Sequence, residues 1–356
     1  MVRANFWPGH PASYIVFLQN LIAMPKTVEE IAKKIGVSIT TVRLVINGQA
    51  EKYRISAKTQ KVVEDYVAQH GYVLNHAARS LKLKRSDAIG FVVPELANAF
   101  FARLMSELEI LCRNRGLVLL TASTHEDPEQ ENRAVESLLS RGVDGLVFAP
   151  CQIPGHKQLL NKKSNTAVVL VDRDYNQLRF PTVLSDNYHS GLDLSRRMFT
   201  EAKGPVHFLC AHADLPSIQD RLRGFSVACQ EAGQGAGTDL IHFANEDNTA
   251  AGFQMMQSLI AHLCTVPAAF MCSSLLVLEG ALQQLKASTG SIPAHILIGT
   301  FDDHAMLDLL PNRVLSVKQD EAMLASLVFE RLLEQMGGSE ATQMRNTVPC
   351  RLICRN

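Results

Sequence analysis

Polar and aromatic residues follow several short apolar runs in the part of the chain after residue 88. A carboxylate or an arginine can bond two neighbouring hydroxyls, and an aromatic ring can cover the apolar face of a sugar. This combination predicts a site for a polyol. The residues at the ends of these runs are 94–101, with Asn98, Phe100 and Phe101 among them, then Asp172 and Arg173, His212, Ser273 and Ser274, and Asp302 and Asp303.

The sequence argues against enzymatic and phosphate-loop chemistry. It contains no G-x-S-x-G elbow and neither standard glycine-rich phosphate loop. No nucleophile, base and orienting group stand out together, so an enzyme is disfavoured. The eight cysteines are scattered, without a C-x-x-C pair or zinc spacing, which fits a reducing, cytosolic compartment. We expect neither a metal nor a cofactor.

The candidate site residues also have plainer interpretations. Asp302 could cap the helix that follows its strand, a role that is compatible with ligand binding. Residues 302–304 could form a metal cluster, although adjacent side chains point in different directions. Arg221 could be a solvated helix arginine. Phe100 and Phe101 could both belong to the core, and we expect that one of them does.

The elements that must position these residues are short strands that alternate with amphipathic helices. Repeated β-α units predict parallel sheets with right-handed crossovers, and ligands of such sheets bind outside the carboxyl ends of the strands. The chain leaves one sheet near residue 185 and returns near residue 318, so we predict two doubly wound lobes, 88–186 with 319–340 and 187–318 with 341–356. The predicted strands are 88–93, 117–121, 146–149, 167–171, 206–210, 240–243, 268–272 and 296–301.

A basic segment precedes the two lobes. Between Met24 and Asp87 there are twelve Lys and Arg residues and six Asp and Glu residues, so this segment carries a charge of +6. The whole chain is neutral, and residues 88–356 carry −7. A basic head on an acidic body predicts a polyanionic partner for the head alone.

Residues 24–73 predict a small helical domain. The pattern gives helices over 27–35, 40–46 and 56–70, the third with Val62, Val63, Tyr66 and Val67 on its core side. The first two helices form a helix-turn-helix. The alternative is a helical hairpin that contacts another protein.

In a helix-turn-helix the second helix lies in the major groove of DNA, with its N-terminal side chains at the base edges. Ile39 can meet a thymine methyl group, and Thr40 can bond a base edge or a phosphate. Arg43 can donate two hydrogen bonds to a guanine. These three residues are therefore the predicted base-reading positions.

Residues 1–23 are expected to be an N-terminal extension that is disordered or precedes the true start at Met24. Their apolar stretch, 14–23, is too short to span a bilayer and contains Gln19 and Asn20. A cleaved secretory signal is the minor alternative, because the basic region and small-residue cleavage site of such a signal are missing.

Four segments of the head, 28–38, 41–48, 58–63 and 71–81, resemble the LacI family of bacterial repressors. The resemblance implies that 74–87 holds a hinge helix and linker, with the hinge ordering on operator DNA and Leu81 wedged into the minor groove. Arg43 and Leu74 depart from the usual Ser and Pro of the family. The DNA-binding residues implied are Thr27, Ser38, Ile39, Thr40, Thr41, Arg43, Asn47, Tyr53, Arg54, Asn75, Ala78 and Leu81.

The resemblance extends over the body and implies lobes of the periplasmic-binding-protein type. Residues 221–225 and 299–303 look like the two effector signatures of the family, in which Arg221 and Asp302 bind the inducer, and Asp172 matches a third position. Ser274 departs from the family's Asn. The effector-binding residues predicted are Asn98, Phe100, Phe101, Asp172, Arg173, Arg221, Ser274 and Asp302.

The predicted function is a cytoplasmic, homodimeric transcriptional repressor that binds double-stranded operator DNA and no membrane. The insertion 51–55 resembles the sucrose and fructose branch of the family, which implies a sucrose-utilisation operon and release by fructose or a fructose phosphate. One alternative is a periplasmic-type sugar-binding protein, which would leave the basic head unexplained. Another is a global, fructose-responsive catabolite repressor or activator.

Overall fold

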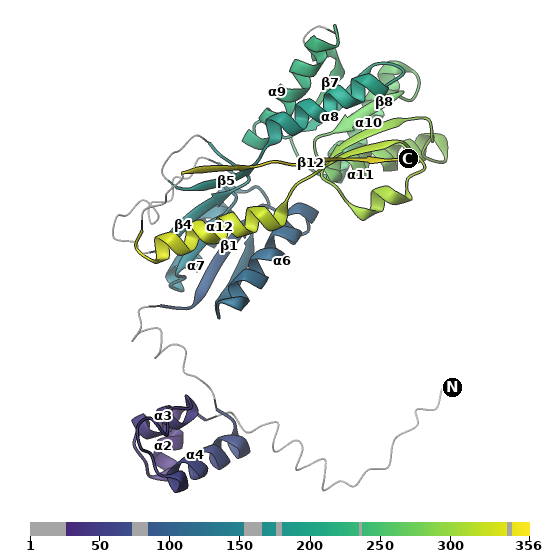
Figure 1. Ribbon diagram of the computed structural model, residues 1–356. Helices are drawn as coiled ribbons and strands as arrows, with labels where there is room; N and C mark the ends of the chain where they lie inside the picture. Colours follow the sequence, from purple (N-terminus) through teal and green to yellow (C-terminus); the bar gives the residue numbers. More distant parts are fainter. Residues whose placement is uncertain (1–25, 73–84, 153–165, 176–179, 235–236, 340–343) are drawn as a thin grey trace, which may run out of the picture. The chain divides into compact units, whose positions relative to one another are not determined.

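The computed structural model describes residues 26–72, 85–152, 166–175, 180–234, 237–339 and 344–356 (Figure 1). The chain divides into two compact units, Met1–Ser86 and Asp87–Asn356. The expected extension 1–23 and the hinge residues Asn75, Ala78 and Leu81 lie outside the described residues.

The first unit contains three helices in its described part, α2 (Val28–Ile35), α3 (Ile39–Ile46) and α4 (Ala57–His70). Gly36 ends α2 with φ 77°, a left-handed conformation that a glycine adopts without steric cost. Val62 is 44 % exposed, which corrects its predicted place on the core side of α4. Val63, Tyr66 and Val67 form the apolar stripe at i, i+3 and i+4, and Val62 lies beside it.

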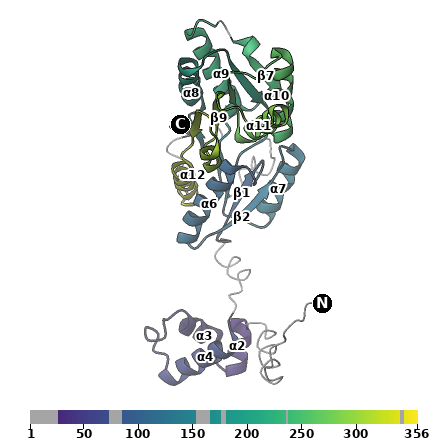
Figure 2. The same ribbon diagram turned by 90° about the vertical axis from the view of Figure 1, so that its right-hand side faces the viewer.

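The first lobe of the second unit has a parallel sheet in the order β11-β5-β4-β3-β1-β2. Figure 2 shows α6 (Ala99–Asn114) and α12 (Glu321–Met336) on one face of this sheet and α7 (Pro128–Ser140) on the other. The strands are β1 (Ala88–Val93), β2 (Val118–Ser123), β3 (Gly145–Phe148), β4 (Ala167–Val171), β5 (Thr182–Ser185) and β11 (Arg345–Val348).

The second lobe has a sheet in the order β12-β10-β9-β8-β6-β7, in which β12 is antiparallel to β10. The helices α8 (Asn187–Glu201) and α9 (Pro216–Glu231) pack on one face, and α10 (Thr249–Leu263) and α11 (Leu275–Thr289) pack on the other. The strands are β6 (Val206–Ala211), β7 (Ile241–Ala244), β8 (Ala269–Cys272), β9 (Leu297–Phe301), β10 (Val314–Lys318) and β12 (Arg351–Arg355), and two short 3-10 helices are η1 (Thr238–Leu240) and η2 (Ala305–Leu309).

The two lobes are joined by three passages of the chain. The first two follow β5 and β10, close to the predicted positions 185 and 318. The predicted assignment of 341–356 to the second lobe is wrong for its first part, because β11 pairs with β5 in the first lobe, with Val348 opposite Ser185. The third passage therefore lies between β11 and β12.

Within the described residues, none of the helices combines the length and apolar character that a membrane span needs.

Candidate functional site

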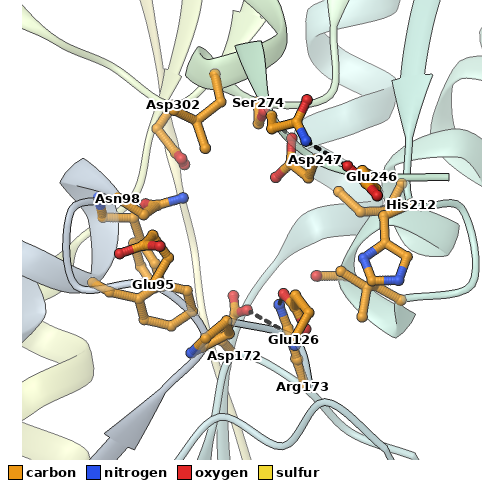
Figure 3. Close-up of a pocket in the computed structure, with 18 of the residues that line it drawn as sticks. Glu95, Asn98, Glu126, Asp172, Arg173, His212, Glu246, Asp247, Ser274 and Asp302 are labelled. Carbon is orange, nitrogen blue, oxygen red and sulfur yellow. Dashed lines mark hydrogen bonds and ion pairs between the residues drawn. The ribbon is translucent and has the colours of Figure 1, made fainter. Parts of the chain in front are cut away.

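A cleft of about 660 Å³ lies between the two lobes, at the carboxyl ends of strands from both sheets (Figure 3). The first lobe contributes the segments after β1, β2 and β4, and the second lobe those after β6, β7, β8 and β9. The structure brings all eight residues predicted to bind an effector into the wall of this cleft: Asn98, Phe100, Phe101, Asp172, Arg173, Arg221, Ser274 and Asp302.

Arg221 is fixed in the cleft wall rather than solvated. Its Nε donates to Asn187 Oδ1 at 2.8 Å and its Nη1 to the carbonyl of Ser273 at 2.7 Å. The guanidinium carbon lies 4.2 Å from the ring centre of Phe301. Burial with these partners excludes the interpretation of Arg221 as a solvated helix arginine.

A close contact between α8 and α9 sets the position of Arg221. A Cβ atom on Gly191 would lie 2.7 Å from the carbonyl oxygen of Arg221, and one on Gly224 would lie 2.5 Å from the amide nitrogen of Leu192. The two helices can approach this closely only because glycines stand at these positions. Asn187, the first residue of α8, then reaches Arg221.

Asp302 follows β9 and is almost fully buried. Its Oδ1 accepts a hydrogen bond from Nε2 of Gln319, whose Oε1 accepts one from the hydroxyl of Ser185. Gln319 and Ser185 stand at the first two passages between the lobes, so Asp302 is connected to the segments that link the sheets. The alternative role of Asp302 as a helix cap is wrong, because His304 caps η2 by accepting from the amide of Met306.

Asp303 takes no part in the cleft. Its Oδ1 accepts from the hydroxyl of Ser316 and pairs with Arg355, in each case at 2.7 Å. Among the residues that the structure describes, no group of three or more His, Cys, Asp or Glu side chains could hold a metal ion.

Asp172 and Arg173 belong to a charged cluster in the first lobe. Arg173 donates to both carboxylate oxygens of Glu126, at 2.7 and 2.5 Å, and its Nε lies 3.6 Å from Asp172. Burial opposes the charge of Arg173, but the ion pair with Glu126 raises its pKa. For Asp172, burial raises the pKa, although the positive charges of Arg173 and Arg221 act in the opposite direction.

The aromatic residues are more buried than expected. Phe100 and Phe101 both belong to the core of the first lobe, 3 % and 4 % exposed, although both also line the cleft. The sequence favoured only one of them as core. Asn98 caps α6 by accepting from the amide of Phe100 at 2.9 Å.

Several lining residues were missed at the level of sequence, among them Glu126 and Asp247. Ser274 caps α11 and donates from its hydroxyl to Asp247, and burial raises the pKa of Asp247. The sequence contained the pattern that identifies them, because polar residues follow the apolar runs of β2 and β7 as they follow the other strands. The missed lining residues with ionisable or amide side chains are His125, Glu126, Asn245, Glu246, Asp247, Asn248 and Gln319.

Four residues that line the cleft have left-handed backbone conformations: His125 (φ 53°), Glu126 (φ 58°), Asp172 (φ 68°) and His212 (φ 50°). Residues other than glycine adopt this conformation at a cost, and they cluster at functional sites. Their concentration at the strand ends supports the assignment of the cleft as a binding site.

The first unit presents the N-terminal part of α3 to solvent. Ile39 is 41 % exposed, and Thr40 and Arg43 are also exposed. Arg43 Nη2 lies 3.1 Å from Oε1 of Glu29 on α2, and both side chains remain about half exposed. The three predicted base-reading residues therefore share one accessible surface.

The other predicted DNA contacts of this unit lie at helix ends or at exposed positions. Thr27 and Ser38 are the N-caps of α2 and α3, and the hydroxyl of Thr41 lies 2.8 Å from that of Ser38. Asn47 is the exposed C-cap residue of α3. The remaining two, Tyr53 and Arg54, are both exposed, Arg54 with φ 54°.

Comparison with known families separates the same two parts of the chain. Residues 27–75 match bacterial regulatory proteins of the lacI family, and residues 89–340 match a periplasmic binding protein domain. The sucrose operon repressor of Klebsiella pneumoniae is 31 % identical over 332 residues, covering 93 % of this chain and 98 % of the relative. The fructose operon regulatory protein of Vibrio cholerae is 33 % identical over 301 residues, covering 84 % and 90 %.

Two solved structures are similar in fold. The Cra transcriptional dual regulator from Pseudomonas putida in complex with fructose 1-phosphate has a TM-score of 0.69 at 26 % identity and covers 76 % of this chain and 99 % of its own. The lac repressor dimer bound to operator and the anti-inducer ONPF has a TM-score of 0.75 at 21 % identity, covering 93 % and 98 %. The chain belongs to the LacI family of bacterial regulatory proteins and is a sugar-responsive transcriptional repressor of that type, not an enzyme.

Proposed function

We propose that this repressor controls an operon for the use of sucrose or fructose, and that fructose or a fructose phosphate releases it from its operator. The observation that carries the proposal is the cleft in which Arg221 and Asp302 lie together with Asp172. A guanidinium and carboxylates can hold neighbouring sugar hydroxyls by paired, charge-assisted hydrogen bonds. The names of the sucrose and fructose relatives support this class of sugar.

The eight cleft residues predicted from the sequence are proposed to form the effector site, with different tasks. Arg221 and Asp302 would bond hydroxyls directly, and Arg173 would hold Glu126 and Asp172 in place. Phe100 and Phe101 would supply the apolar wall. A sugar that binds in this way releases the operator only if it prefers a state of the protein with low operator affinity.

The head is proposed to read the operator through α3. Ile39, Thr40 and Arg43 would contact base edges, and the residues near the helix ends would contact phosphates. The hinge residues Asn75, Ala78 and Leu81 remain part of the proposal by resemblance alone. A homodimer would place two heads on a two-fold operator, and binding to an operator would place the protein in the cytoplasm.

The test is a DNA-binding assay on the full chain. Operator sequences are selected from random duplexes, and release is then followed by fluorescence anisotropy as fructose, fructose 1-phosphate or fructose 6-phosphate is added, with ribose and glucose as controls. Release by a fructose compound at concentrations where ribose and glucose have no effect supports the proposal. Release by ribose alone would contradict it, and failure to select any DNA would contradict the whole regulatory assignment.

A second candidate is a regulator that acts at many promoters in response to fructose compounds. The likeness to the Cra dual regulator, at 26 % identity, favours it specifically. Genome-wide mapping of bound sites separates the two, because an operon repressor occupies one or a few sites and a global regulator occupies many.

A further inference from the structure

The lining of the cleft carries a net negative formal charge. Six carboxylates line it, Glu95, Glu126, Asp172, Glu246, Asp247 and Asp302, against the two arginines Arg173 and Arg221. With His125 and His212 neutral, the formal charge of the lining is −4. Low-dielectric walls concentrate such a potential inside a cleft.

The two arginines are largely committed to groups of the protein. Arg173 is bidentate to Glu126 and also donates to the carbonyl of Pro150 at 3.3 Å. Arg221 uses Nε and Nη1 for Asn187 and Ser273, which leaves Nη2 without a hydrogen-bond partner among the described residues. One guanidinium nitrogen is sufficient for a hydroxyl. The partners of Arg221 are neutral, so it keeps its positive charge, but one positive charge cannot balance a phosphate dianion in a cleft whose lining already has a net negative charge.

Four of the six carboxylates pair with groups that carry no fixed positive charge. Glu246 accepts from the amide of Asn248 at 2.7 Å, Asp247 accepts from Ser274, and Asp302 accepts from Gln319. Glu95 lies 3.1 Å from the imidazole of His125. These contacts do not neutralise the four carboxylates, so their negative charge acts on a ligand in the cleft.

Protonation of Asp172 and Asp247 would not make the lining of the cleft neutral. Burial raises the pKa of Asp172 and that of Asp247. With both of these side chains protonated, the lining still has a formal charge of −2. A dianion placed beside four carboxylates would meet repulsion in either protonation state.

The part of the wall best suited to an anion is the N-terminus of α9. Leu215 caps this helix without a side-chain hydrogen bond, and Ser217 lies in its first turn. Asp172 and Asp214 line the same recess as Ser217, so this helix end faces carboxylates as well. The N-terminus of α9 is therefore better suited to bind a hydroxyl group than a phosphate group.

We propose that the cleft takes its effector as an uncharged sugar and discriminates against the phosphate esters of that sugar. This inference rests on the proposed function and narrows its ligand class. The carboxylates recognise sugar hydroxyls by accepting hydrogen bonds, and the same carboxylates repel a phosphate group.

The experiment is titration calorimetry of the full chain with fructose, fructose 1-phosphate and fructose 6-phosphate. We expect fructose to bind at least about tenfold more tightly than either ester, because a dianion meets several unit charges at close range. Raising the salt from about 0.1 M to about 1 M shortens the screening length from about 10 Å to about 3 Å. Higher salt should therefore reduce the difference in affinity between fructose and its esters.

A charge-neutral variant tests the cause. Glu246→Gln keeps an acceptor for Asn248 but removes one negative charge at the exposed rim of the cleft. The dissociation constant of each ester, divided by that of fructose, should fall by about fivefold in this variant. The matched control is Glu136→Gln, at an exposed position of α7 outside the cleft, which should leave the ratio as in the parent protein.

The outcomes separate this inference from the proposed function. Esters that bind as tightly as fructose, or more tightly, overturn the inference and leave the fructose assignment standing. A chain that binds neither fructose nor its esters overturns the assignment itself. A preference for fructose that changes neither with salt nor in Glu246→Gln would show a steric origin, and would overturn the electrostatic argument.

Discussion

Arg221 combines burial, fixed hydrogen bonds and a free nitrogen at the cleft, so a single substitution should separate sugar binding from DNA binding. Arg221→Ala removes a donor to a buried ligand hydroxyl, which costs roughly 1 to 3 kcal/mol of sugar affinity. We expect the variant to bind operator and no longer release it when fructose is added. Calorimetry and anisotropy on the same preparation measure the two properties.

The control for Arg221 lies two residues away on the same helix. Arg223 is exposed, pairs with Asp220 at 3.0 Å, and is absent from the lining of the cleft. Arg223→Ala should therefore respond to fructose like the parent protein. If Arg221→Ala kept the parental sugar affinity, the proposed effector site would be wrong.

Substitution of Arg43 tests whether this single side chain recognises a base pair of the operator. Its contact with Glu29 is between two half-exposed side chains, so it contributes little to stability and leaves the guanidinium available to DNA. Arg43→Ala should reduce discrimination at one base pair of the operator by roughly 1 to 3 kcal/mol. Selection of binding sites from random duplexes measures this change.

Lys33→Ala removes the same charge from an exposed position of α2 and serves as the comparison for Arg43. It should weaken binding to all sequences alike, because a phosphate contact carries no base preference. An unchanged site preference in Arg43→Ala would assign this arginine to phosphate or solvent.

At the scale of elements, the contact between α8 and α9 is a sensitive point. A methyl group on Gly191 would meet the backbone of Arg221 at 2.7 Å, and backbone cannot move aside as a flexible side chain can. Gly191→Ala should lower the free energy of unfolding by about 1 to 3 kcal/mol and weaken fructose binding as Arg221 shifts. Thermal unfolding and calorimetry measure both effects.

Asp193→Ala is the companion variant, since Asp193 is an exposed residue of the same helix. It should change neither property appreciably. A Gly191→Ala protein with parental stability would mean that the two helices separate without cost.

The strands β6 and β7 carry a histidine pair that makes the second lobe sensitive to acid. Nδ1 of His207 lies 3.1 Å from Nε2 of His242, and burial with the nearby His242 and His262 lowers the pKa of His207 to about 4. Between its ordinary pKa of about 6.5 and this lowered pKa, His207 is protonated in the unfolded chain and neutral in the folded chain. The free energy of unfolding therefore decreases as the pH falls from about 6.5 to about 4. The loss from this residue is at most about 3 kcal/mol.

Comparing the pH dependence of thermal unfolding in His207→Gln and in the parent protein isolates this contribution. The variant should lose less stability over that range. His295→Gln, at an exposed position, should follow the parent curve. Parallel curves for His207→Gln and the parent would place the acid sensitivity elsewhere.

The elements also show how far the sequence could predict the structure. Strands β1 and β4 begin and end at the predicted residues, because each is an apolar run with clear limits. Asp87 and Pro94 flank β1, and Thr166 and Asp172 flank β4. β11 was missed, since Arg345–Val348 alternates exposed and buried residues over a single short edge strand. Nothing in such a pattern specifies which of two sheets the strand joins.

The candidate site was predictable to the extent that its residues follow strong strand signals. Asp172 and Asp302 come directly after buried runs, and the rule for carboxyl ends of parallel strands brought them together. Glu126 and Asp247 follow the weaker, partly exposed strands β2 and β7, and were not identified. The link from Asp302 through Gln319 to Ser185 depends on tertiary contacts over 134 residues.

At the scale of the whole molecule, the proposed effector site and the DNA-binding head lie in different compact units, so we expect a sugar to act on operator binding by allosteric coupling and not by competing for the same site. Linkage requires the coupling to be reciprocal. If fructose weakens operator binding by some factor, operator DNA must weaken fructose binding by the same factor. Typical couplings of this kind correspond to about 5- to 150-fold.

Both halves of this cycle can be measured on the full chain. Anisotropy gives the operator dissociation constant with and without saturating fructose, and calorimetry gives the fructose dissociation constant with and without saturating operator. The two ratios should agree in the parent protein. In Arg221→Ala they should change together, because the substitution removes one donor to the sugar and leaves the head intact. An operator dissociation constant that stays the same when fructose saturates its site would contradict the coupling, and would show that fructose does not release the operator through the cleft.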